Sequence, residues 1–288
     1  MEIIRITPQG ICGGVRSALN QIFATINDKS IPKPIYIFGA LVHNQHVIKR
    51  LEKDFILLND NTDPFKTIAS LIKGTIIFSA HGTDPKIIDY ARKNLYVLDL
   101  VCPKVKEIHQ LVLDKLQNGY TIIYLGKKGH KETKAVLSLS PKIILTEKVE
   151  DLQNIDFTNK KIFATNQTTL EYTLTESFYQ ELKKISPTSE IGDKICEAAK
   201  SRQKALNNYS GLDLVYVAGD TMSSNAVSLL KFAKQIFPKA FLISSKEDIK
   251  ISDLDKGYKI GVTSGASVPD YVVDDIVDFL EQHKYSDT

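Results

Sequence analysis

Three cysteines, Cys12, Cys102 and Cys196, are the residues of this chain best suited to bind a metal. They follow one another at nearly equal intervals of 90 and 94 residues, and none belongs to a Cys-x-x-Cys pair. An odd number of cysteines without an export signal argues against a disulfide framework, and the lack of pairs argues against a zinc ribbon. Buried free thiols are the simple alternative, but the regular spacing favours a repeated unit with one thiol in each copy.

Six polar loops carry the other side chains suited to chemistry, two in each third of the chain. Within each third the two loops lie about forty residues apart. Their candidate side chains are His43 and His81, then His130, Glu132 and Thr168, then Ser223, Ser224, Asn225 and Ser267. Histidines, hydroxyls and an amide, with Glu132 as the one carboxylate, suit the binding of a highly charged anion such as phosphate or diphosphate.

The elements that must position these groups repeat as well. Each cysteine precedes a helical pattern, and each helix precedes a β-like run that ends in glycine, at 34–39, 121–126 and 212–219. In the first two thirds a short run then returns to the next cysteine, and the opening run of the chain can supply this strand for the last third. The pattern predicts an α/β fold of three similar small domains, 13–101, 102–195 and 196–288, the last closed by the N-terminal strand 1–12.

Parallel α/β sheets collect ligand groups outside the carboxyl ends of their strands. All three cysteines and all six polar loops follow β-like runs, so a pseudo-threefold ring would direct them at one central cavity. Helix N-termini favour the thiolate form, and converging thiolates are metal ligands. The residues alone leave two metals open: zinc with a histidine as the fourth ligand, or an iron–sulfur cluster with one iron left for substrate.

Composition excludes several other classes of protein. The 288 residues carry 37 basic and 34 acidic side chains, and this net charge of +3 is too small to predict nucleic-acid binding. No stretch is long and apolar enough for a membrane helix, and the N-terminus lacks the pattern of a signal peptide. We therefore expect a cytoplasmic protein with no nucleic-acid or membrane partner.

Nine short motifs, in this order along the chain, resemble those of the LytB family of 4-hydroxy-3-methylbut-2-enyl diphosphate reductases. The motifs are Gly10-Ile11-Cys12-Gly13-Gly14-Val15, His43-Asn44, Ser79-Ala80-His81-Gly82, Cys102-Pro103, Gly129-His130-Lys131-Glu132, Gln167-Thr168-Thr169, Ile195-Cys196, Ser223-Ser224-Asn225 and Gly265-Ala266-Ser267. The resemblance extends from about residue 3 to residue 280. It implies reductive removal of a hydroxyl group, giving isopentenyl and dimethylallyl diphosphate in the last step of the non-mevalonate isoprenoid pathway.

The resemblance also implies roles for individual residues. Cys12, Cys102 and Cys196 would hold one [4Fe-4S] cluster per chain, and ferredoxin or flavodoxin would supply the electrons. Glu132 matches the proton-delivering acid, Thr168 the hydroxyl that relays protons or positions water, and His130 lines the cavity. The substrate-binding residues would be His43, His81, His130, Thr168, Ser223, Ser224, Asn225 and Ser267, and all of these except His130 and Thr168 would bind the diphosphate.

Several positions beside the implied site depart from the family pattern. Lys131 stands in place of a proline, Asn166 in place of a threonine, and Met222 and Ala226 in place of polar residues, and Arg16-Ser17 replaces an acidic residue followed by arginine. Two other functions are compatible with the spacing. One is a lyase like quinolinate synthase, which also uses an open-iron cluster on three cysteines. The other is a non-catalytic scaffold that binds zinc and phosphate. Glu132 could also be a helix-entry acid, and Ser223 and Ser224 could be helix N-caps.

Overall fold

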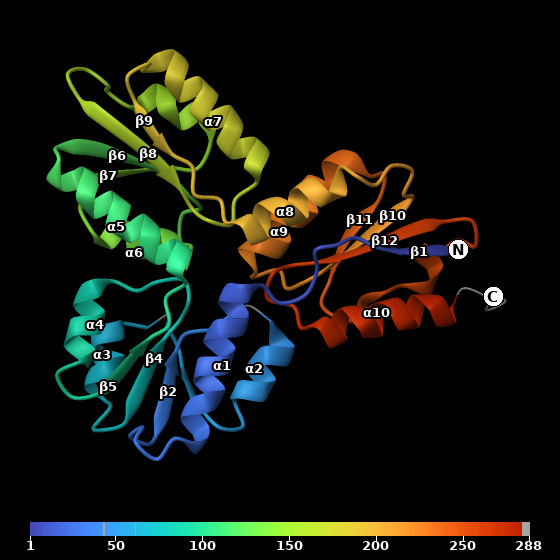
Figure 1. Cartoon of the computed structure of the whole chain (residues 1–288), viewed down its shortest axis with the longest axis horizontal. Helices are drawn as coiled ribbons and strands as arrows, with labels where there is room; N and C mark the ends of the chain where they lie inside the picture. The colour runs from blue at the N-terminus through green and yellow to red at the C-terminus, as the bar shows by residue number, and fades with distance from the viewer. Residues whose placement is uncertain (43, 61, 284–288) are drawn as a thin grey trace. The chain divides into compact units, whose positions relative to one another are not determined.

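A computed structural model describes residues 1–42, 44–60 and 62–283 (Figure 1). By its internal contacts the chain divides into two compact units. Unit 1 comprises Met1–Val15, Val42–Lys49 and Cys196–Thr288, and unit 2 comprises Arg16–Leu41 and Arg50–Ile195. Among the described residues, no helix combines the length and the apolar character needed to cross a bilayer.

The described residues form three sheets of four parallel strands, and the three sheets share one strand order. The orders are β3-β2-β4-β5, β7-β6-β8-β9 and β11-β10-β12-β1. The first two lie in unit 2 and the third in unit 1. The α/β class predicted from the sequence is therefore confirmed, and so is the presence of three similar α/β units.

The first sheet of unit 2 is built from β2 (Ile35–Phe38), β3 (Ile56–Leu58), β4 (Thr75–Phe78) and β5 (Tyr96–Asp99). Unit 2 also contains α1 (Gly13–Asn27) from Arg16 onward, α3 (Pro64–Ala69) and α4 (Pro85–Ala91), whereas most of α2 (Gln45–Leu51) belongs to unit 1. Every residue of β4 is buried, as expected for a central strand of a sheet covered on both faces.

The second sheet of unit 2 is built from β6 (Tyr120–Leu125), β7 (Ile143–Thr146), β8 (Lys161–Asn166) and β9 (Glu190–Gly192). Its helices are α5 (Pro103–Gln117), α6 (Lys131–Ser138), the short 3-10 helix η1 (Val149–Asn154) and α7 (Tyr172–Ile185). Alternate residues of β6 enter opposite cores because side chains of a strand point to alternate faces. Ile122 and Tyr124 pack with α5 and α6, whereas Ile123 and Leu125 pack with α7.

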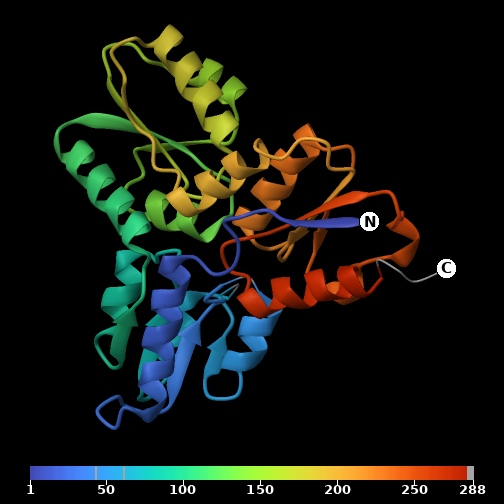
Figure 2. The same ribbon diagram turned by 45° about the vertical axis from the view of Figure 1, so that its right-hand side comes forward.

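Unit 1 contains β1 (Glu2–Arg5), β10 (Leu214–Ala218), β11 (Ala240–Ile243) and β12 (Lys259–Ser264). Its helices are α8 (Glu197–Leu206), α9 (Ser224–Ile236) and α10 (Asp270–Gln282), with the 3-10 helices η2 (Lys246–Asp248) and η3 (Ile251–Asp253). The helix α10, red in Figures 1 and 2, runs along β1 and β12. β1 pairs with β12 from Glu2↔Lys259 to Arg5↔Val262, so the opening run does supply the missing fourth strand.

The sequence pattern did not indicate β3, β7 and β11, which stand at the same edge in the three strand orders. These strands have only three or four residues and are partly exposed at one edge of each sheet. Such short edge strands lack the long apolar run that marks β6 or β10. The domain boundaries at 13–101, 102–195 and 196–288 stay predictions, although every described strand, including β1 in segment 1–12, falls in the segment expected for its sheet.

Candidate functional site

Two polar loops of unit 2 meet because the strands before them are neighbours. β6 and β8 pair in parallel up to Leu125↔Asn166, and the Gln167 amide then donates to the Leu125 carbonyl at 2.8 Å. The side chain of Gln167 continues this connection by accepting from the Lys127 amide at 3.0 Å. The loops that carry His130 and Thr168 therefore leave the sheet side by side.

Glu132 lies in the first turn of α6 and is only 1% exposed. Its carboxylate accepts from the Thr168 amide at Oε1 and from the Thr168 hydroxyl at Oε2, each at 2.8 Å. The Tyr124 hydroxyl donates to Oε1 at 3.4 Å. This arrangement brings two of the predicted catalytic residues, Glu132 and Thr168, into direct contact.

Burial dominates the electrostatics of Glu132 and raises its pKa to about 7. The hydrogen bonds from Thr168 and Tyr124 act in the opposite direction, because they stabilise the carboxylate. Burial beside the charged carboxylate also raises the pKa of Tyr124 well above its ordinary value. A carboxyl group that titrates near neutrality can hold a proton and release it at physiological pH, as a general acid must.

The raised pKa of Glu132 predicts a pH-dependent difference in stability between the wild type and a Glu132→Gln variant. Between pH 4.5 and about 7 the folded protein binds more protons than the unfolded chain, so this stabilisation is lost as the pH rises through about 7. Glutamine mimics the neutral acid and does not titrate. From pH 5 to pH 8 the free energy of unfolding of the wild type should fall by about 2–3 kcal/mol relative to the variant.

Urea unfolding of both proteins at the two pH values measures this difference. Glu176→Gln, the same change on an exposed residue of α7, provides the control and should show no such trend. Parallel stability curves for the wild type and Glu132→Gln would contradict the assignment of a neutral buried acid.

His130 and His81 lie next to each other in unit 2, with ring centroids 5.8 Å apart in an edge-to-face arrangement. His130 is the N-cap of α6, and its Nδ1 accepts from the Glu132 amide at 3.2 Å. An accepting Nδ1 places the proton of the neutral ring on Nε2. His81 is tied to Ser79, whose hydroxyl lies 3.3 Å from its Nδ1.

The departures from the family pattern have local explanations in the structure. The Lys131 Nζ lies 2.6 Å from Asp60 Oδ2, so the lysine that replaces a proline ties the start of α6 to the segment after β3. Asn166 is fully buried, and its Oδ1 accepts from the Tyr179 hydroxyl at 2.6 Å. Ala226 is fully buried, whereas the side chain of Met222 is mostly exposed.

Each cysteine follows the fourth-position strand of a sheet and precedes a helix. Cys102 and Cys196 are the N-caps of α5 and α8, and neither thiol makes a capping hydrogen bond. Cys12 Sγ accepts from the Val15 amide at 3.4 Å. All three are half-buried and outside any disulfide in the described chain.

Backbone hydrogen bonds connect two of these cysteines to the predicted polar loops. The Cys102 amide donates to the Ala80 carbonyl, next to His81, at 3.0 Å. In unit 1 the Cys12 amide donates to the Ala266 carbonyl, next to Ser267, at 2.9 Å. A predicted metal ligand and a predicted anion-binding residue are thus adjacent in each of these two places.

The third group of predicted residues surrounds the start of α9 in unit 1. Ser223 is the N-cap, with its hydroxyl 3.4 Å from the Ala226 amide, and Ser224 and Asn225 form the first turn. Asn225 Oδ1 accepts from the Ala266 amide at 3.0 Å, which leaves its NH₂ group as the donor end. The buried Ser267 hydroxyl has no hydrogen-bond partner among the described residues. A helix N-terminus with amide and hydroxyl groups beside it is suited to an anion.

The predicted site residues therefore fall into two groups. Unit 2 brings together His81, His130, Glu132 and Thr168 and places Cys102 beside the His81 loop, whereas unit 1 brings together Cys12, Ser223, Ser224, Asn225 and Ser267 and contains Cys196. His43 lies outside the described residues. Within those residues, no three His, Cys, Asp or Glu side chains form a ready-made group of metal ligands.

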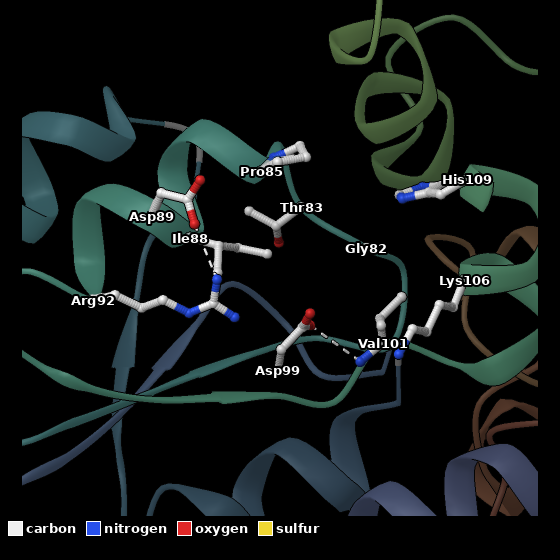
Figure 3. A pocket seen from close by; sticks show the side chains of 10 residues that line it. All are labelled: Gly82, Thr83, Pro85, Ile88, Asp89, Arg92, Asp99, Val101, Lys106 and His109. Carbon is white, nitrogen blue, oxygen red and sulfur yellow. Dashed lines mark hydrogen bonds and ion pairs between the residues drawn. The ribbon is translucent and has the colours of Figure 1, made fainter. Parts of the chain in front are cut away.

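A pocket of about 210 Å³ lies between α4 and α5 in unit 2 (Figure 3). His109 lies half-buried in its wall, where a Cβ added at Gly82 would approach its ring to 3.0 Å. Burial lowers the pKa of His109, and the charge of Asp99 partly opposes this shift. None of the predicted site residues lines this pocket, so it is separate from the predicted catalytic groups.

Two residues of the site environment were not indicated by motif reasoning. Tyr124 belongs to a strand and its hydroxyl reaches Glu132 only through the fold. Arg202 is buried in α8, and its position in the sequence could have indicated this burial. It lies three residues from Ala199 and from Ala205, so it falls on the apolar stripe of an amphipathic helix.

Comparison with known proteins shows which family this chain resembles along its length. The model of the LytB protein family matches residues 3–281. The 4-hydroxy-3-methylbut-2-enyl diphosphate reductase of Symbiobacterium thermophilum is 37% identical over 98% of both chains, and that of Bacillus subtilis is 35% identical over the whole of this chain and 93% of its own.

A solved structure shares the fold as well. The structure titled E-1-hydroxy-2-methyl-but-2-enyl-4-diphosphate reductase from Plasmodium falciparum is similar with a TM-score of 0.90 and 31% identity, over 99% of this chain and 90% of that one. The family match covers nearly the whole sequence, and relatives above 30% identity at full length support it. The chain therefore belongs to the LytB family.

Proposed function

We propose that this protein is an iron–sulfur reductase that converts 4-hydroxy-3-methylbut-2-enyl diphosphate into isopentenyl and dimethylallyl diphosphate by reductive dehydroxylation. The observation that carries the proposal is the buried Glu132–Thr168 pair within a chain of the LytB family. The names of the relatives support the substrate. Family membership also argues against a lyase like quinolinate synthase.

We propose that Cys12, Cys102 and Cys196 together hold one [4Fe-4S] cluster. The donor set fits such a group, because the three thiols are half-buried, stand at helix starts and are outside any disulfide. When bound, the cluster supplies the electrons for cleavage of the C–O bond. A ferredoxin or flavodoxin as the electron donor and a cytoplasmic location remain parts of the proposal.

Proton delivery is the task proposed for the buried pair in unit 2. When Glu132 carries a proton on Oε2, the bond to the Thr168 hydroxyl 2.8 Å away reverses and the acid becomes the donor. The hydroxyl can then accept this proton while it releases its own. Removal of a hydroxyl group consumes protons, and a pKa of about 7 keeps a large share of Glu132 protonated at neutral pH. His130, as a neutral ring with its proton on Nε2, would donate toward the cavity.

Diphosphate binding is the task proposed for His43, His81, Ser223, Ser224, Asn225 and Ser267. The helix N-terminus at Ser223–Asn225 and the orphaned Ser267 hydroxyl support the unit 1 part of this set. Asn225 would act as a donor, because its oxygen is already engaged by the Ala266 amide.

Turnover tests the proposal. Protein purified and reconstituted without oxygen, supplied with 4-hydroxy-3-methylbut-2-enyl diphosphate and a chemical reductant, should form the two C5 diphosphates.

Asn225→Asp should keep the hydrogen bond from the Ala266 amide but replace a donor by a negative charge, raising KM about a hundredfold or more. Asn118→Asp, at the end of α5, is the matched control. A colourless protein that binds zinc and yields no product would favour the scaffold alternative and overturn the proposal.

A further inference from the structure

Arg202 is a buried cation within unit 1, on the helix that begins after Cys196. Its side chain is nearly inaccessible, with a relative exposure of 4%. The guanidinium donates from one terminal nitrogen to the Ala198 carbonyl and from the other to the Gly10 carbonyl, each at 2.7 Å. The second bond spans 192 residues and ties α8 to the loop that leads into Cys12.

The charge of this arginine is only partly compensated by the groups around it. Among the described residues it makes no ion pair, and its Nε is buried without a hydrogen-bond partner. Burial lowers the pKa of Arg202, and negative charge on Cys12, Cys196 and Asp270 opposes that shift, in this order. Geometry places the guanidinium beside the same two cysteines, because its acceptor Gly10 lies two residues before Cys12 and its acceptor Ala198 lies two residues after Cys196.

Burial of an uncompensated charge costs free energy, because the charge loses its hydration. A stable fold therefore places hydrogen-bond acceptors or opposite charges beside a buried charge. Two backbone carbonyls provide part of the compensation. Thiolates at Cys12 and Cys196 would provide the rest, because a thiolate-bound iron–sulfur cluster is anionic and gains a further negative charge on reduction by one electron. Nearby charge and hydrogen bonding are the means by which a protein sets a cluster's reduction potential.

We propose that Arg202 is a positioning residue that raises the reduction potential of the cluster and orients Cys12 relative to Cys196. The inference rests on the proposed cluster. Through the Gly10 bond the side chain positions the Cys12 loop against α8, and through its charge it favours the reduced, more negative state.

The experiment compares wild type, Arg202→Gln and Arg202→Lys, each reconstituted without oxygen. Iron and sulfide are counted, and the reduction potential is measured by titration with dithionite followed by electron paramagnetic resonance. At the wild-type midpoint potential, the ratio of reduced to oxidised cluster in Arg202→Gln should fall about tenfold, a shift of about 59 mV to more negative values. Arg202→Lys keeps the charge and should lie closer to the wild type.

The control is Arg92→Gln, which removes the same charge from an exposed side chain paired with Asp89. Its potential should match the wild type. Loss of iron from Arg202→Gln but not from Arg202→Lys would also support the charge role. Equal potentials in fully loaded wild type and Arg202→Gln, or equal losses in both Arg202 variants, would overturn it. Those outcomes leave the proposed function intact, whereas a wild type without iron and sulfide would overturn the proposed function itself.

Discussion

Replacing Cys102 or Cys196 by serine should give a folded protein that has lost most of its iron and shows no detectable turnover. A serine hydroxyl is a poor ligand for iron compared with a thiolate, and three ligands leave no spare one to compensate. Measurement of iron and sulfide after anaerobic reconstitution, together with the visible absorption of the cluster, checks this expectation.

The position of these cysteines separates the loss of a ligand from the loss of the fold. Cys102 and Cys196 are N-caps that make no capping hydrogen bond, and serine is among the preferred N-cap residues. In a thermal scan, the Tm of each variant apoprotein should therefore be at least as high as the Tm of the wild-type apoprotein. Full iron content and colour in either variant would contradict the assignment of that cysteine as a ligand.

Glu132→Gln should slow turnover by about 10²–10⁴-fold while iron content and substrate binding stay near the wild-type level. The amide is close in size to the neutral acid and can donate to the Thr168 hydroxyl, so the buried contacts persist. It cannot release a proton, so the loss falls on the chemical step. Single-turnover kinetics with the pre-reduced protein and measurement of substrate affinity separate the two effects.

Glu176→Gln, on the exposed side of α7, is the matched control and should turn over at the wild-type rate. Near-normal turnover in Glu132→Gln would show that the proton comes from another group, with His130 or a water molecule held by Thr168 next in line. A loss of iron in this variant would indicate a structural role for the carboxyl group.

Much of the fold could be predicted because its signals are local. The apolar runs that become β6, β8, β10 and β12 are followed by polar loops, and regular spacing of the cysteines indicated a repeat. The repeat also indicated that the opening run of the chain supplies a strand for the last third, and β1 does pair with β12. The edge strands β3, β7 and β11 escaped prediction because three or four half-exposed residues carry little apolar pattern.

The sequence by itself determined the α/β class, the repeated unit and the set of candidate ligands, since these depend on residue type and on spacing along the chain. Only the tertiary structure decided the chemistry of particular groups. Glu132 titrates near neutrality because the fold buries it almost completely, and this burial outweighs the hydrogen bonds from Thr168, 36 residues away, and Tyr124, which lower its pKa. Arg202 is joined to Gly10 because two distant segments pack together within unit 1. The pKa of a group and the burial of a charge depend on which side chains, distant in the sequence, exclude water from it. Local periodicity in the sequence does not indicate those contacts.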